Sequence, residues 1–161
     1  MSTPASMTAE YAIRFAIPAD AAALARLRYA LRAGVGRATE PEAEFVKRCA
    51  AWMEEHLKSD AWHCWIAEAN ARLVGAVWLQ MVEKIPNPRV EPEHHAYITN
   101  FYVEEAARGR GIGSQLLHDV IDWCKTRDVH AIILWPTGRS RSLYERYGFA
   151  VRDDILELII K

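Results

Sequence analysis

A short run of glycine and arginine carries the chain's clearest chemical signal. Arg108, Gly109, Arg110, Gly111, Ile112 and Gly113 follow one another directly and are succeeded by Ser114. Glycine allows the tight turns that point backbone N–H groups inward, and the N-terminus of a following helix offers further unpaired N–H donors. Both features, together with the two guanidinium groups, favour a phosphate oxygen. We therefore expect residues 100–114 to bind an anion, in particular a pyrophosphate.

The two common nucleotide-binding loops do not fit this run. A nucleoside-triphosphate loop needs Lys-Ser or Lys-Thr after its last glycine, whereas Gly113 is followed by Ser114 and Gln115. A dinucleotide loop needs the spacing GxGxxG within repeated strand–helix–strand units. Here the glycines alternate and follow three strands that we expect to be antiparallel, so a nucleotide-dependent oxidoreductase is disfavoured.

The elements around the run predict a mixed α/β protein. Apolar residues at helical spacing, such as Leu116, Leu117 and Val120, place a helix over residues 114–127. Period-two alternation, buried-looking apolar runs and turn residues place the other elements. We expect strands at 11–17, 62–68, 73–83, 95–103 and 131–135, helices after Asp20, after Thr39 and at 140–147, and a terminal hairpin from 149–151 and 155–160. The strand, helix and strand between 95 and 135 would form one parallel crossover in an otherwise antiparallel sheet.

Composition limits the classes of function. The chain has 161 residues, a net charge of −1 and a hydrophobic fraction of 51%, which predict a single soluble domain over residues 1–161 with frayed residues 1–10 and no attraction to nucleic acid. No apolar run is long enough for a membrane span, and the start lacks the pattern of a signal peptide, so we expect a cytoplasmic location. The histidines and the three cysteines show no metal-binding spacing, so we expect no metal.

Two motifs resemble the GCN5-related N-acetyltransferase (GNAT) superfamily. Its pattern Arg/Gln-x-x-Gly-x-Gly/Ala is matched by Arg108, Gly111 and Gly113, and a later Leu-Tyr-Glu-x-x-Gly-Phe is matched by residues 143–149. The resemblance implies a mostly antiparallel sheet splayed between its fourth and fifth strands and flanked by about four helices. It also implies acetyl-CoA as cosubstrate, with its pantetheine arm in the gap beside Phe101, Tyr102 and Val103 and its pyrophosphate on Arg108, Gly109, Arg110, Gly111, Ile112, Gly113 and Ser114.

The resemblance also suggests a catalytic acid. Tyr144 would lie beside the sulfur and protonate the departing thiolate. The alternative is a tyrosine whose ring merely packs under Gly148 and Phe149. The chain departs from the family where Thr137 stands in place of a frequent asparagine, so the acceptor is not inherited from the family.

The general base is more open. If the phosphate loop lies at the end of the fourth strand, His95 and Glu83 stand on the opposite rim, where the acceptor should enter. Each is otherwise a solvated strand end, and Glu68, on the other rim, is a poorer candidate. Trp78 and Trp135 are candidates for lining an apolar acceptor pocket.

These features predict an enzyme that moves an acetyl group from acetyl-CoA to a primary amine of a small molecule or peptide by direct transfer. The alternative is a non-catalytic acyl-CoA-binding domain that acts as a sensor or interaction module. The apolar ending, residues 155–160, could supply a strand-mediated homodimer.

Overall fold

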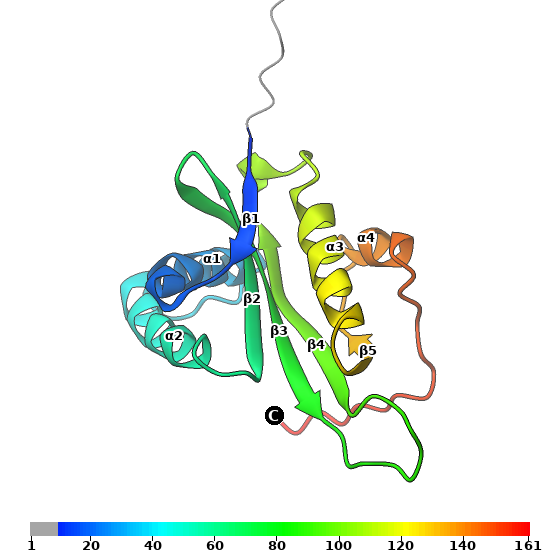
Figure 1. The fold of residues 1–161 in the computed structure, drawn as a ribbon. Coiled ribbons are helices and arrows are strands. Elements are labelled where there is room, and N and C mark those ends of the chain that lie inside the picture. Colours follow the sequence, from blue (N-terminus) through cyan, green and yellow to red (C-terminus); the bar gives the residue numbers. More distant parts are fainter. Residues whose placement is uncertain (1–9) are drawn as a thin grey trace, which may run out of the picture.

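The computed structural model describes residues 10–161, so the expected frayed start lies outside it apart from Glu10. Within this range the chain forms a five-stranded sheet in the order β1-β2-β3-β4-β5 (Figure 1). The strands are β1 (Ala12–Phe15), β2 (Trp62–Ala69), β3 (Arg72–Glu83), β4 (His94–Val103) and β5 (Val129–Ile133). The α-helices are α1 (Ala21–Ala33), α2 (Glu42–His56), α3 (Ile112–Lys125) and α4 (Arg141–Arg146).

The sheet is mixed, as the sequence predicts. Strands β1 to β4 pair antiparallel in chain order, and β4 pairs parallel with β5 through the crossover helix α3. Figure 1 shows α1 and α2 on one side of the sheet and α3 and α4 on the other. The expected mixed α/β fold is thereby confirmed.

Alternation along the strands produces two cores. Trp65, Val77 and Leu79 pack toward α3, together with Leu116 and Leu117 of that helix. On the other face Ile66 and Trp78 pack with residues of α1 and α2. Because strand side chains alternate between the faces, β2, β3 and β4 contribute to both cores.

Strand β4 leaves β5 halfway along its length. Their pairing runs from His94 opposite Val129 to Tyr97 opposite Ile133, where β5 ends. Residues 98–103 continue alongside β3, and no other strand within residues 10–161 covers their second edge. The sheet is therefore splayed between its fourth and fifth strands.

A β-bulge lies in the splayed half of β4. Trp78 pairs with Thr99 while Ala76 pairs with Tyr102, so β4 holds one extra residue there, and Asn100 has φ of 51°. The bulge reverses the alternation. As a result Phe101 packs on the α3 side, as Ile98 does, whereas Tyr102 packs toward α1 and α2.

The expected terminal hairpin is wrong. Residues 149–161 form no strand or helix, and Leu156 and Leu158 are 95% and 82% exposed. The turn residues Arg152 and Asp154 do form an ion pair. A two-stranded hairpin is marginal unless it docks on a sheet or helix. Phe149 packs against Tyr144 of α4, but residues 150–161 are exposed.

Two local expectations are also corrected. Asp20 does not cap α1 with its side chain, which instead pairs with Arg14 and accepts a hydrogen bond of 2.8 Å from the Ile17 N–H. Strand β5 spans Val129–Ile133 rather than residues 131–135. Leu134 and Trp135 are apolar but follow the strand, so the apolar run overestimates where pairing ends.

Candidate functional site

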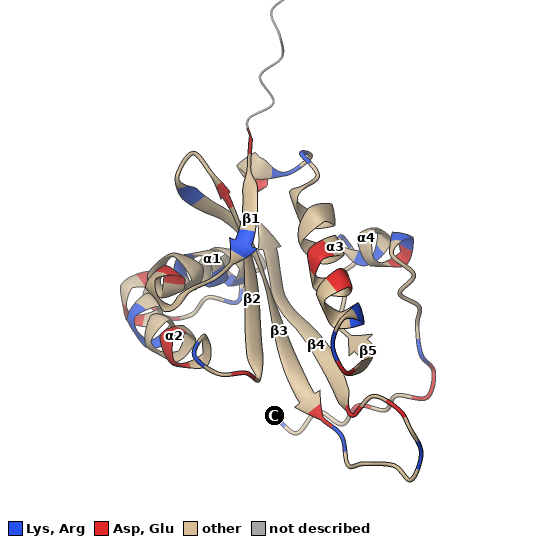
Figure 2. Ribbon diagram, in the orientation of Figure 1, with Lys and Arg blue, Asp and Glu red and all other residues tan. Residues whose placement is uncertain are grey.

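The glycine run forms the left-handed turn that opens α3. Gly109 and Gly111 have φ of 76° and 79°, and Gly111 is the N-cap residue. The first helical hydrogen bond runs from the Gln115 N–H to the Gly111 carbonyl. The N–H groups of Ile112, Gly113 and Ser114 therefore precede the intrahelical ladder, as anion binding requires. Figure 2 shows basic residues in this turn.

Arg108 joins the turn to the end of β4. Its Nε donates a hydrogen bond of 2.8 Å to the Val103 carbonyl, and its guanidinium carbon lies 5.6 Å from the centroid of the Tyr102 ring. Arg110, the second basic residue of the turn, is half-buried. Arg108 thus holds the turn against β4. The sequence predicted only a contact between this arginine and phosphate.

The two sequence motifs meet in space. A Cβ placed on Gly113 would lie 3.8 Å from Cδ2 of Leu143 and 4.0 Å from Cζ of Phe101. The Tyr147 hydroxyl donates a hydrogen bond of 3.0 Å to the Ser114 carbonyl. Three parts of the chain therefore meet at one junction: the predicted cofactor-binding residues of β4, the glycine turn, and helix α4.

Tyr144 is buried at this junction. It is 6% exposed, and its ring centroid lies 6.1 Å from that of Phe101 and 5.6 Å from that of Phe149. Burial raises the pKa of its phenol to about 12, although a hydrogen bond with the Ser140 side chain opposes the rise. The phenol is thus protonated at neutral pH, and its ring also packs in the core as the alternative interpretation expects.

Glu83, the last residue of β3, and His95, near the start of β4, stand at the end of the sheet opposite the glycine turn. Glu83 is exposed and pairs with His94 in the strand register, whereas His95 is half-buried. His95 Nδ1 is buried and has no hydrogen-bond partner among the described residues. Burial, and then the nearby charges of Lys84 and His130, lower the pKa of His95.

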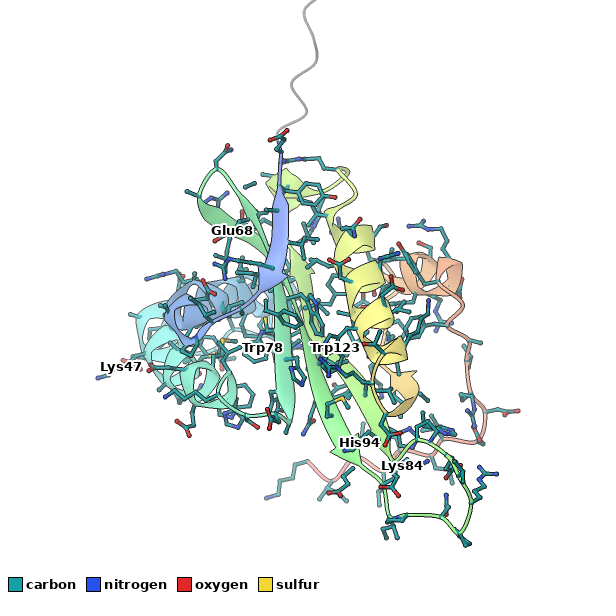
Figure 3. All side chains as sticks on the ribbon, in the orientation of Figure 1. Lys47, Glu68, Trp78, Lys84, His94 and Trp123 are labelled. Atoms are coloured by element: carbon teal, nitrogen blue, oxygen red, sulfur yellow. The ribbon has the colours of Figure 1, made fainter. Side chains whose placement is uncertain are left out.

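Glu68 is occupied at the other end of the sheet. Its Oε1 lies 2.8 Å from Nη2 of Arg14. Figure 3 shows Glu68 far from His94, which marks the His95 rim. Its carboxylate is therefore engaged by Arg14 and lies away from the rim on which Glu83 and His95 stand.

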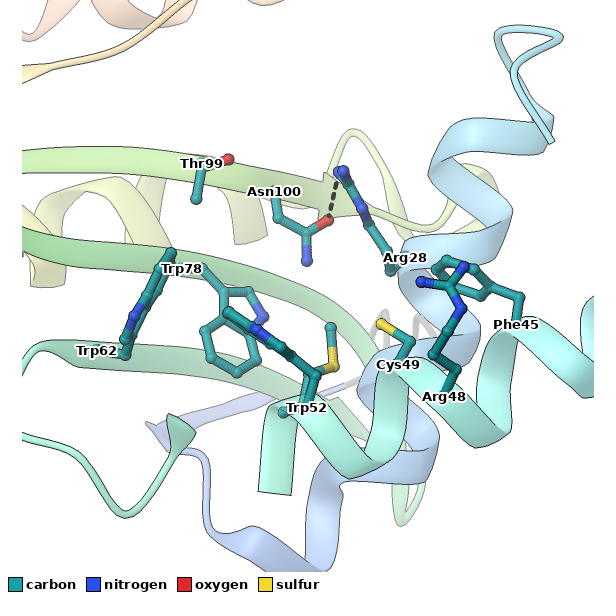
Figure 4. Close-up of a pocket in the computed structure, with 10 residues that line it drawn as sticks. Arg28, Phe45, Arg48, Cys49, Trp52, Trp62, Trp78, Thr99 and Asn100 are labelled. Atoms are coloured by element: carbon teal, nitrogen blue, oxygen red, sulfur yellow. Dashed lines mark hydrogen bonds between the residues drawn. The ribbon is translucent and has the colours of Figure 1, made fainter. Parts of the chain in front are cut away.

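Two hollows lie along the face of β4 that is turned toward α1 and α2. One, of about 320 Å³, is lined by Val82, His95, Tyr97, Ile133 and Trp135. The other, of about 340 Å³, is lined by residues that include Arg28, Cys49, Trp52, Trp62, Trp78 and Asn100 (Figure 4). Trp78 and Trp135, both candidates from the sequence, line one hollow each. His95 faces the first hollow and Tyr144 lies on the α3 side, so the candidate base and acid lie on opposite faces of the sheet.

Sequence reasoning missed Arg28, and it placed Asn100 only at the start of the anion-binding segment 100–114, not in this hollow. Arg28 stands four residues after Leu24 and three before Leu31, within the apolar stripe of α1. A charged residue in that stripe was the available signal. Asn100 gave no comparable signal, because its bulge depends on pairing with β3.

The cysteines and histidines form no metal centre within residues 10–161, where no group of three or more potential ligands is found. Cys49, Cys64 and Cys124 are free thiols, and burial raises the pKa of each. In the same range no helix is long and apolar enough to cross a bilayer.

Known proteins share sequence and fold with this chain. The model of the acetyltransferase (GNAT) family matches residues 28–149. An uncharacterised N-acetyltransferase of Methanocaldococcus jannaschii is 28% identical over 116 residues, which are 66% of this chain and 48% of that protein. The chain therefore spans about half the length of this curated relative.

Solved structures show the same fold. A predicted acetyltransferase of Clostridium acetobutylicum, crystallised with acetyl-CoA, superposes with a TM-score of 0.79 at 27% identity over 94% of this chain and 97% of that one. A GCN5-related N-acetyltransferase of Ralstonia eutropha gives a TM-score of 0.78 at 23% identity over 94% and 100% of the two chains.

Proposed function

Because the chain belongs to the GNAT family of acetyltransferases, we propose that it moves an acetyl group from acetyl-CoA to a primary amine of a small molecule or peptide by direct transfer. The family and the relatives support acetyl transfer in general. Residues 1–161 would form one acetyltransferase domain.

The observation that carries the proposal is the parting of β4 from β5 beside the glycine turn. After Tyr97 the second edge of β4 is open, and the strand runs on to Val103, which Arg108 binds. An extended ligand with amide groups can pair with such an edge as a neighbouring strand would. The N–H groups at the start of α3 would then hold its pyrophosphate, so the residues present fit coenzyme A.

Transfer requires an unprotonated amine, and His95 is the better of the two candidate bases. Its lowered pKa keeps the ring neutral at neutral pH, and its buried Nδ1 has no partner among residues 10–161. Glu83 is exposed at the rim. The amine nitrogen attacks the thioester carbonyl, and His95 would take the proton that this nitrogen loses.

The departing sulfur requires a donor, and Tyr144 is our candidate. With a pKa raised to about 12, its phenol stays protonated throughout the neutral range. It would donate a hydrogen bond to the sulfur as the carbon–sulfur bond breaks and pass its proton to the departing thiolate, which leaves as the free thiol. The phenolate would then regain a proton from solvent. This interaction belongs to the transition state because the thioester sulfur carries little charge.

The release of free thiol from acetyl-CoA in the presence of a panel of primary amines tests the proposal. We expect release that depends on both the enzyme and the amine. Thermal melting separates the alternatives, since a ligand at a hundredfold excess over its Kd contributes about 2.7 kcal/mol. Stabilisation by acetyl-CoA without release with any amine would favour the non-catalytic binding domain, and no stabilisation would reject both.

A further inference from the structure

Arg28 is a half-buried cation without an anionic partner. Its Nη1 donates to Oδ1 of Asn100 at 3.4 Å, and no carboxylate within residues 10–161 forms an ion pair with it. Burial and the neighbouring charge of Arg32 lower the pKa of Arg28, so its surroundings oppose the positive charge. A charge withdrawn from water is costly unless it is paired, which makes this position suited to an anion supplied by a ligand.

The hollow beside Arg28 offers further hydrogen-bond donors. Trp78 is 2% exposed, and its buried Nε1 has no hydrogen-bond partner among the described residues. Asn100 adds a side-chain amide, and Figure 4 shows its amide nitrogen directed into the hollow. None of the residues that line this hollow is acidic. A buried donor without an acceptor, Trp78 Nε1, indicates that the ligand brings an acceptor oxygen.

The other lining arginine is already neutralised. Arg48 forms an ion pair with Glu40, and its guanidinium lies 5.4 Å from the centroid of the Phe45 ring. Arg48 is also 67% exposed at its side chain. Arg28 is therefore the charge in this hollow for which an incoming anion would be the counter-ion.

The rest of the lining is largely aromatic, and Cys49, Met53 and Thr99 complete it. The ring centroid of Trp52 lies 5.1 Å from that of Trp62 and 6.0 Å from that of Trp78. These faces suit a flat apolar body that stacks or packs edge to face. An aromatic cage can also hold an ammonium ion, but Arg28 and the absence of acidic lining residues disfavour a ligand that is only a cation.

Position connects the hollow with the reaction. Asn100 directly precedes Phe101, the first of the β4 residues expected to lie beside the pantetheine arm. The volume of about 340 Å³ lies at the lower end of ligand pockets, which suits a small molecule. We propose that this hollow binds the acceptor, and that the acceptor is a small aromatic amine bearing a carboxylate that pairs with Arg28. This inference rests on the proposed acetyl transfer.

Matched pairs of ligands test the inference by calorimetry, with the protein held in saturating CoA. L-phenylalanine, L-tyrosine and L-tryptophan are each compared with phenethylamine, tyramine and tryptamine, which lack the carboxylate. We expect at least one amino acid to bind roughly tenfold or more tightly than its partner, as a charge-assisted pair implies. If no amino acid binds better than its partner, the inference is overturned.

Variants then test whether the carboxylate of the ligand pairs with Arg28. Arg28→Gln should remove the preference for the amino acid, and Arg26→Gln, an exposed position on the same helix, should retain it. Asn100→Asp should also remove the preference, because it supplies Arg28 with an internal carboxylate. An unchanged preference in both Arg28→Gln and Asn100→Asp would overturn the inference, and melting curves show whether each variant is folded.

Turnover separates this inference from the proposed function. Thiol release with amines in general, but with no advantage for those that carry a carboxylate, would uphold acetyl transfer and reject the assigned acceptor. Carboxylate-dependent binding without thiol release from any amine would uphold the anion site and reject the acetyl transfer.

Discussion

The rings of His95 and His130 lie edge to face with their centroids 5.5 Å apart. His95 belongs to β4, and His130 lies at the point where the register between β4 and β5 shifts. Two imidazolium charges at this separation would repel each other. His130 therefore helps Lys84 and burial to lower the pKa of His95, which keeps His95 a free base at neutral pH.

This pair predicts the acid limb of the pH–rate profile. If His95 is the base, kcat should decrease in acid with a midpoint below pH 6.5, because the lowered pKa keeps the ring neutral down to more acid pH. His95→Gln should lose roughly a hundredfold or more in kcat. His130→Gln should keep the plateau but move the limb to higher pH, since a neighbouring positive charge is gone. If the acid limb does not move in His130→Gln and His95→Gln keeps full activity, His95 is excluded as the general base.

The two glycines of the turn should respond oppositely to alanine. Gly111 has φ of 79°, so Gly111→Ala should lower the free energy of unfolding by about 1–2 kcal/mol. Gly113 lies in α3, where a new Cβ meets nothing closer than 3.8 Å. Gly113→Ala should therefore raise stability by up to about 1 kcal/mol. Urea unfolding without ligand measures both, and equal effects would contradict the distinct backbone roles.

Local patterns in the sequence suffice for most elements. Leu116, Leu117 and Val120 define α3 because one helical face must meet the sheet, and all three are fully buried. The helix starts two residues earlier than its periodicity suggests, since a left-handed Gly111 cap leaves no hydrophobic pattern. The parallel crossover followed from element order alone.

Features that depend on pairing between distant segments could not be predicted from the sequence. The Asn100 bulge requires knowledge of the register with β3, and the contact between Arg28 and Asn100 joins positions 72 residues apart. Two apolar runs and the turn residues between them predicted the hairpin in residues 149–160, but a strand needs an edge on which to dock. Of the residues that line the hollow beside Arg28, the sequence therefore predicted only Trp78 as part of an acceptor pocket.

The ion pair of Asp20 and Arg14 predicts an acid-sensitive contribution to stability. Two contacts of 2.8 and 2.9 Å join the side chains, and Asp20 is 9% exposed. Asp20→Asn should lower the free energy of unfolding by about 1–3 kcal/mol at pH 7. Glu104→Gln, which breaks an exposed pair with Arg72, is the control and should change it by less than about 1 kcal/mol.

The same pair sets the direction of the pH dependence. The hydrogen bonds from Arg14 lower the pKa of Asp20, so the stabilisation is fully present above the ordinary carboxyl pKa of about 4. It is lost as pH falls through the lowered pKa of the folded state. The difference between wild type and Asp20→Asn should thus shrink in denaturant unfolding at pH 3. A difference that grows in acid would contradict this assignment.

Tyr144 offers the sharpest separation of chemistry from packing. Tyr144→Phe keeps the ring against Phe101 and Phe149, so a residue that only fills space would lose little rate. If the phenol assists the departing sulfur, kcat should fall roughly a hundredfold or more while the Kd for acetyl-CoA stays nearly unchanged. Stopped-flow turnover and calorimetric titration measure the two quantities.

The leaving group supplies the control for this variant. A thiol of lower pKa needs less help from a donor, so the rate difference between the wild-type enzyme and the Tyr144→Phe variant should narrow as acyl donors with more acidic thiols are used. A packing defect would instead slow every donor by the same factor, because it does not sense charge on the sulfur. Since the pKa of Tyr144 is raised to about 12, the wild-type advantage should also persist across the neutral range. Equal turnover of both enzymes, with chemistry shown to limit the rate, would leave solvent as the proton donor.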